Sequence, residues 1–265
     1  MRILTLFLAL VAGPTLAHEL WLDPADFTIP RNVMLRADIV NGEDFEGSRL
    51  SYLPRRFSRF DMIRGEQVQP VENRLGARPA LEAAPLGAGL HILAYEANTA
   101  RVGYETLEKF ASFADHKDFV DAVARHRARG LPETDFGEAY SRHVKALVAV
   151  GDGTGQDRPL GLETEIVALE NPYTFDASTL PVQVFYDQAP RAAAQVEVFE
   201  KAPDGSVAVT YHRTDERGIA NLPVKPGHAY LADAVVLRRP DAELAEARDV
   251  VWETLWAALT FAIPE

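Results

Sequence analysis

Short apolar segments separated by turn residues fill the second half of the chain. This pattern constrains the possible fold more than any other feature of the sequence. The segments are bounded by Gly, Pro, Asn or Asp, which is typical of strands and not of helices. Their length and spacing are typical of a β-sandwich. The predicted strands span residues 162–169, 181–187, 195–201, 207–213, 219–224, 229–237 and 250–263.

The first part of the chain has the same character. Residues 33–40 alternate loosely between apolar and polar side chains, and residues 49–60 are long and rich in aromatic residues. Residues 89–95 form a compact apolar run after a turn rich in Pro and Gly. Alternation with a period of two is the pattern of a strand. We therefore expect an antiparallel β-sandwich before about residue 104.

Two helices are predicted between these β regions. Residues 115–129 end in a cluster of arginines before Gly130 and Pro132, as helices often do. Residues 135–150 begin with Asp135 and Glu138 at the spacing of a capping box. The expected buried stripes are Phe119, Val120, Val123 and Ala124 in the first helix, and Phe136, Tyr140, Val144, Leu147 and Val148 in the second.

The chain has no cysteine, which excludes disulfides and thiolate metal sites, so its core alone must hold the fold. The formal net charge is −12, which argues against nucleic acid or an anionic membrane as a partner and is compatible with attracting cations. No stretch after residue 17 approaches the ~20 apolar residues of a membrane span. No serine stands in a nucleophile motif, so a binding role is favoured over catalysis.

Residues 1–17 have the layout of a secretory signal peptide. Arg2 is the charged start, an apolar run follows, and Thr15 and Ala17 are the small residues before the expected cleavage site. Cleavage would make His18 the first residue of a periplasmic or secreted chain of 265 − 17 = 248 residues. Two alternatives would leave no metal site at the terminus. Cleavage could occur a residue or two away, or His18 could be an ordinary solvent-exposed terminus.

A histidine at a free amino terminus offers a metal ion two nitrogens, the terminal amine and ring Nδ1. With a second histidine, this chelate suits copper and is plausible for nickel or cobalt. The candidate ligands are therefore His18, followed by His91, His143 and His116. His91 lies in a predicted strand of the same domain as His18, where the alternative is a half-buried histidine bonded to a backbone carbonyl.

The other histidines have plainer alternatives. His143 lies on the apolar stripe of its predicted helix, which favours a core or interface residue over a ligand. His116 and His126 flank a helix, and His126 lies among arginines as favourable positive charge at a helix C-terminus. His212 and His228 belong to the second β region and are not assigned to the site.

Three segments of the second β region resemble the repeats of transthyretin-like modules, which are rarely catalytic. They are residues 188–198, 214–218 and 226–231. The predicted fold is therefore mainly β, with two antiparallel β-sandwich domains, immunoglobulin-like or transthyretin-like, joined by a helical hairpin. The expected divisions are a signal peptide at 1–17, a sandwich at 18–104, the hairpin and linker at 105–158, and the transthyretin-like sandwich at 159–265.

Nearly the whole mature chain resembles the bacterial family known as domain of unknown function 4198. The matching segments are residues 18–24, 138–148, 159–167 and 251–261. The resemblance implies a secreted or periplasmic protein, often described as a component of cobalt or nickel uptake, with no established enzymatic activity. It also favours assigning the metal to the start of the mature chain at His18.

These observations leave three classes of function. The first is an exported protein that binds nickel, cobalt or copper and delivers it, with a membrane metal transporter as an expected partner. The second is a non-catalytic ligand-binding or adhesion module that needs no metal. The third is a copper oxygenase that uses the terminal histidine, which would also require a flat substrate surface.

Overall fold

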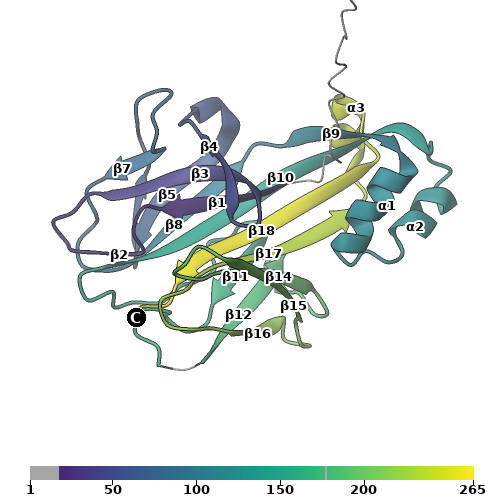
Figure 1. Cartoon of the computed structure of the whole chain (residues 1–265). Coiled ribbons are helices and arrows are strands. Elements are labelled where there is room, and N and C mark those ends of the chain that lie inside the picture. The colour runs from purple at the N-terminus through teal and green to yellow at the C-terminus, as the bar shows by residue number, and fades with distance from the viewer. Residues whose placement is uncertain (1–17, 177) are drawn as a thin grey trace, which may run out of the picture.

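The structure is a computed structural model that describes residues 18–176 and 178–265, and it is mainly β (Figure 1). One ten-stranded sheet runs through the molecule, with β10 and β18 paired in parallel at its centre. Its main path is β15 (Val207–Arg213), β14 (Gln195–Lys201), β17 (Ala229–Arg238), β18 (Trp252–Ala262), β10 (Thr134–Val150), β8 (Gly89–Ala97), β5 (Phe57–Arg64) and β6 (Gln67–Pro70), while β2 (Thr28–Ile29) and β9 (Ala100–Thr106) also pair with β10.

A four-stranded sheet covers each face of this long sheet. The first packs against one face through residues such as Trp21, Leu22 and Ile39, and comprises β1 (Glu19–Pro24), β3 (Leu35–Glu43), β4 (Glu46–Leu50) and β7 (Leu81–Ala83). The second packs against the opposite face, and comprises β11 (Thr164–Ala168), β12 (Thr179–Tyr186), β13 (Ala189–Pro190) and β16 (Ile219–Pro223). The β-sandwich packing that the strand pattern predicts is thus confirmed.

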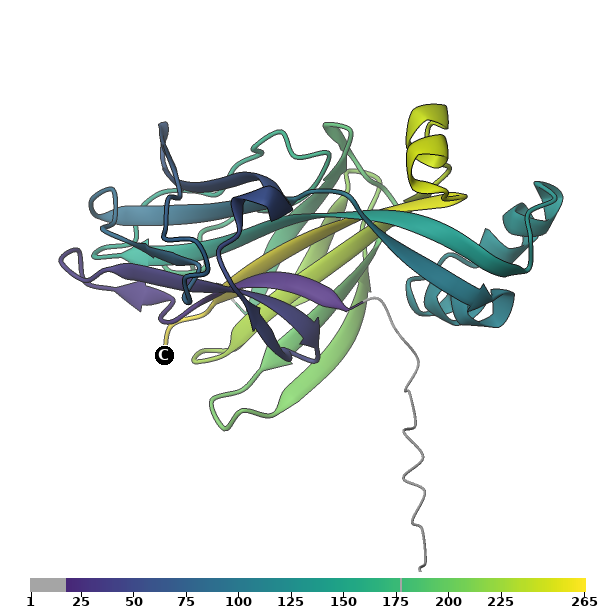
Figure 2. The same cartoon turned by 90° about the horizontal axis from the view of Figure 1, so that it is seen from above.

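Two helices cover the end of the long sheet beside β1. These helices, α1 (Leu107–His116) and α2 (Ala122–Ala128), bury Phe110 and Phe113 against Trp252 and Trp256 of β18. A further helix, α3 (Ala242–Arg248), connects β17 to β18, and a 3-10 turn (Pro54–Arg56) precedes β5. Figure 2 shows all three helices at the same end of the molecule.

The predicted helix at residues 135–150 is wrong, because these residues form most of the 17-residue strand β10. The residues of its supposed stripe, such as Phe136, Tyr140 and Val144, are four apart, a spacing that also places side chains on one face of a strand. Both faces of β10 are covered, and its last five residues, 146–150, are a continuous apolar run. A helix pattern and a fully buried strand are difficult to distinguish under these conditions.

The predicted helix at residues 115–129 is also wrong in its bounds and its stripe. The chain forms α1, breaks at Asp118, where φ is +62°, and continues as α2. Val120, which was expected to be buried, is 85% exposed. By contrast, all seven strands predicted in the second half are present, and Trp252 and Trp256 share a buried face of β18.

The predicted division of the chain at residues 104 and 159 stays a prediction, and strands from both sides of it join in the ten-stranded sheet. The predicted signal peptide, residues 1–17, lies outside the described residues. Among the residues that the structure describes, no helix is long and apolar enough to cross a membrane.

Candidate functional site

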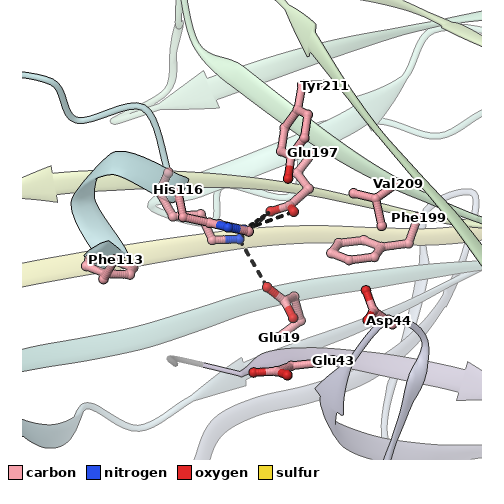
Figure 3. A pocket seen from close by; sticks show the side chains of 10 residues that line it. Glu19, Glu43, Asp44, Phe113, His116, Glu197, Phe199, Val209 and Tyr211 are labelled. Carbon is pink, nitrogen blue, oxygen red and sulfur yellow. Dashed lines mark hydrogen bonds and ion pairs between the residues drawn. The ribbon is translucent and has the colours of Figure 1, made fainter. Parts of the chain in front are cut away.

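An acidic pocket of about 190 Å³ lies where β1, the end of α1 and strands β14 and β15 meet (Figure 3). Four of its ten lining residues are carboxylates and one is a lysine. The lining residues are Glu19, Glu43, Asp44, Phe113, His116, Lys117, Glu197, Phe199, Val209 and Tyr211. The pocket thus places an excess of negative charge beside apolar and aromatic walls.

Lys117 lies at the back of this pocket and is surrounded by three carboxylates. Its Nζ donates to Glu19 Oε1 at 3.0 Å, to Glu197 Oε2 at 2.6 Å and to Asp233 Oδ2 at 3.0 Å. The ammonium also lies 4.7 Å from the ring centroid of Trp256. All three carboxylates are buried, and oxygens from each lie within 4.8 Å of one another. We call Lys117 and these three carboxylates the lysine cage.

The lysine cage carries one positive and up to three negative charges. Burial disfavours the Lys117 ammonium, but the charges of Asp233, Glu19 and Glu197 outweigh this and raise its pKa. Burial also raises the pKa of Glu19 and of Asp233. Burial acts on Glu197 in the same direction, but hydrogen bonds from His116 and Lys117 lower its pKa overall. The cage therefore fixes a cation of the protein itself.

His116 is the last residue of α1 and lies at the open side of the pocket. Its Nε2 lies 3.0 Å from Glu197 Oε1, and its side chain is 41% exposed. The hydrogen bond to Glu197 raises the pKa of His116. A carboxylate bonded to one ring nitrogen orients a metal-binding histidine and leaves the other nitrogen free to bind.

His18 does not line this pocket, but it directly precedes the lining residue Glu19 and contacts the lining residue Glu43. Its Nδ1 lies 3.1 Å from Oε1 of the pocket residue Glu43, and both side chains are about half exposed. The backbone carbonyl of His18 accepts a hydrogen bond from Arg142, whose guanidinium lies 4.9 Å from the Trp256 ring centroid. The start of β1 is thereby fixed to the long sheet.

His91 does not lie at this pocket. It pairs with Val148 of β10, six residues beyond Arg142, which corresponds to roughly 20 Å along the strand. Its Nε2 accepts from the backbone N–H of Leu86 at 2.9 Å, and Nδ1 lies 3.1 Å from Gly89 O. Both ring nitrogens are therefore occupied inside the fold, which is the alternative that the sequence left open.

His143 also lies elsewhere, on the opposite face of β10 from Arg142. It is buried, and Nε2 lies 3.1 Å from Ser141 Oγ. Burial lowers the pKa of His143 to about 4. Of the four predicted ligands, only His116 lines the acidic pocket, and His18 contacts the lining residue Glu43.

A buried polar network lies behind the pocket. Trp256 Nε1 donates to Thr254 Oγ1 at 3.0 Å, and this hydroxyl donates to Glu138 Oε1 at 2.5 Å. The Tyr104 hydroxyl donates to Glu138 Oε2 at 2.9 Å. Burial raises the pKa of Glu138 to about 7.

Sequence reasoning did not identify the lysine cage. Asp233 is the single acid of the otherwise apolar strand β17, apart from its terminal Arg238, and a lone acid in such a run is the signal that could have found it. Glu197 gave no such signal, because β14 also contains Glu200 and Lys201. Lys117 gave no such signal, because the sequence predicts it inside a helix at residues 115–129, whereas it directly follows α1 in the structure. Its partners are 80 to 116 residues away in the chain.

A family model described as "Domain of unknown function (DUF4198)" matches residues 15–238. The match covers most of the chain, so the protein belongs to this family. No curated protein matches the sequence.

Proposed function

Since membership of this family assigns no activity, we propose from the pocket that the protein is an exported transition-metal-binding protein. The metal ligands are the amine and Nδ1 of His18 and a carboxylate oxygen of Glu43. His116, which lines the same pocket as Glu43, joins them only after a movement, because these three residues do not form a group with ligand atoms within 4.8 Å of one another. The observation that carries this proposal is the distance of 3.1 Å between His18 Nδ1 and Glu43 Oε1 at the edge of the acidic pocket. A cation held by His18 would therefore gain a carboxylate ligand without a large movement.

The chemistry of the donors favours a transition metal over calcium or magnesium. Imidazole and amine nitrogens suit copper, nickel and cobalt, whereas the hard cations prefer oxygen ligands alone. Glu43, Asp44 and the lysine cage give the pocket a negative potential that attracts a divalent cation. Lys117 already occupies the centre of the cage, so the metal is assigned to the open, histidine side of the pocket.

The first prediction is that the mature protein binds one copper ion more tightly than nickel or cobalt, as the general affinity order requires. His18→Ala should weaken binding by roughly a hundredfold, because it removes the ring of the chelate. His116→Ala should weaken it by about tenfold, because the ion then loses one neutral ligand. The measurement is a calorimetric titration of protein that begins at His18.

His228→Ala is the matched control. His228 also lies beside a glutamate, with its Nδ1 2.9 Å from Glu200 Oε1, but neither residue lines the pocket. Its loss should leave the affinity for copper unchanged. Binding that is equally strong in the His18 and His228 variants would overturn the proposed ligands, and no binding by the mature protein would favour a ligand-binding module without metal.

Delivery of the metal to a membrane transporter is the physiological role that this proposal includes. The exposed side chains of His18 and Glu43 support it, because an ion at the edge of a pocket can pass to a partner by exchange of ligands. Such transfer requires no opening of the β-sheets.

A further inference from the structure

A second pocket, of about 320 Å³, lies beside α2 and differs from the first in charge. It is lined by Arg125, Ala128, Arg129, Arg239 and Trp252. Arg125 belongs to α2, Arg129 caps the end of that helix, and Arg239 follows β17 directly. Two separate parts of the chain thus bring three guanidinium groups to one pocket, which we call the arginine pocket.

The floor of the arginine pocket is Trp252, whose side chain is buried. Its Nε1 donates to His126 Nδ1 at 3.0 Å, which fixes the plane of the indole. The Cζ atoms of Arg125 and Arg129 lie 5.2 Å and 4.6 Å from the ring centroid. Arg129 Nη2 also donates to Val251 O at 2.8 Å. Two of the three arginines are therefore held in place before any ligand arrives.

Two of the three positive charges in the arginine pocket have no ion-pair partner among the described residues. No carboxylate lines it, and neither Arg129 nor Arg239 forms an ion pair with a described residue. Burial lowers the pKa of Arg129, and the positive charges of Arg239 and Arg125 lower it further. Arg125 has a single partner, Asp121, at 3.2 Å on the exposed side of α2.

The helix dipole explains only part of this arrangement. Positive charge near the end of α2 is favourable, which accounts for Arg125 and Arg129. It does not account for Arg239, which comes from another element and adds repulsion to the same place. In a protein with a net charge of −12, a group of three arginines of which two have no ion-pair partner among the described residues is therefore more consistent with a ligand than with stability.

We propose that the arginine pocket binds a small anion with two or more acidic oxygens, such as phosphate or a polycarboxylate. Guanidinium groups bind such oxygens through paired, charge-assisted hydrogen bonds, and Trp252 keeps two of them oriented. This site is separate from the acidic pocket and does not depend on the metal proposal.

The test is a calorimetric titration of the mature protein with inorganic phosphate and with citrate. Arg239→Gln and Arg129→Gln should each weaken binding by about tenfold, because each removes one charged hydrogen-bond donor. Arg127→Gln is the matched control: Arg127 lies on the same helix but points to Glu133, with Nε 2.7 Å from Oε1. It should change the affinity by less than about twofold.

Arg239→Gln also protects the test from a folding defect, because Arg239 makes no hydrogen bond or ion pair to the described residues, whereas Arg129 bonds to Val251 O. Equal affinity in Arg239→Gln and Arg127→Gln would overturn the proposal. So would the absence of binding at about 10 mM of either anion. Vesicles of phosphatidylglycerol form a third arm, and binding to vesicles without binding to free anions would replace the small anion by a lipid surface.

Discussion

At the scale of single residues, the site depends on how buried charges are satisfied. Lys117 is stabilised as a cation by three carboxylates. Its ammonium in turn offsets the free-energy cost of removing these carboxylates from water. Among the described residues, Glu138 has no such cation in contact and is bonded by hydroxyl groups only. Because hydroxyl groups compensate burial less well than a cation, Glu138 keeps its proton to a much higher pH than an ordinary carboxyl.

This difference predicts a pH-dependent stability for Glu138. The carboxyl ionises near pH 4.5 in the unfolded chain and near 7 in the folded protein. Between these values the unfolded state binds fewer protons, so the contribution of Glu138 to stability falls as the pH rises, by about 3 kcal/mol in total.

Glu138→Gln should remove this loss, because its amide accepts from Thr254 and donates to Tyr104 without ionising. The free energy of unfolding in urea should therefore rise, relative to the unaltered protein, between pH 5 and pH 8. A difference between the two proteins that stays constant over this range would show that Glu138 is ionised throughout.

At the scale of elements, the strands and the helices were predicted with unequal success. Strands β14 and β15 have the predicted bounds, because Pro, Gly and Asp turns bound them and β-branched or aromatic residues fill them. Strand β10 was mistaken for a helix because both its faces are covered, which removes the alternation that would identify it. The residue types of His18 and His116 made them candidate ligands in the sequence, and this assignment stays a prediction. The lysine cage forms only through contacts between distant segments.

The cage also predicts how α1 is attached. Lys117 follows α1 and joins it to β1, β14 and β17, so Lys117→Met would remove the ammonium that three buried carboxylates share. Removal of one partner from a buried ion pair costs about 3–5 kcal/mol, and we expect a loss of this size in urea unfolding at pH 7.

Lys109→Met is the control for this prediction. Lys109 lies on the same helix and pairs with Glu105 at 2.5 Å, but both side chains are exposed. Its loss should cost less than about 1 kcal/mol. Similar losses for the two lysines would mean that the cage contributes no more than a surface ion pair.

At the scale of the whole molecule, one strand supports both pockets. Trp256 lies beside the lysine cage and Trp252 forms the floor of the arginine pocket, and the two residues are four apart on the same face of β18. This spacing corresponds to roughly 13 Å along the strand. The C-terminal end of α1 lines the acidic pocket, and the C-terminal end of α2 lines the arginine pocket. An acidic and a basic site therefore share β18 as a single rigid support.

The central claim is that the metal is bound by the amine and the ring of His18 together. The most direct measurement compares the copper affinity of the mature protein with that of the same protein carrying one alanine before His18. The added residue converts the amine into an amide and leaves every side chain in place. We predict a loss of affinity of roughly a hundredfold with an unchanged melting temperature of the metal-free protein. Equal affinity of the two proteins would contradict the terminal-histidine site.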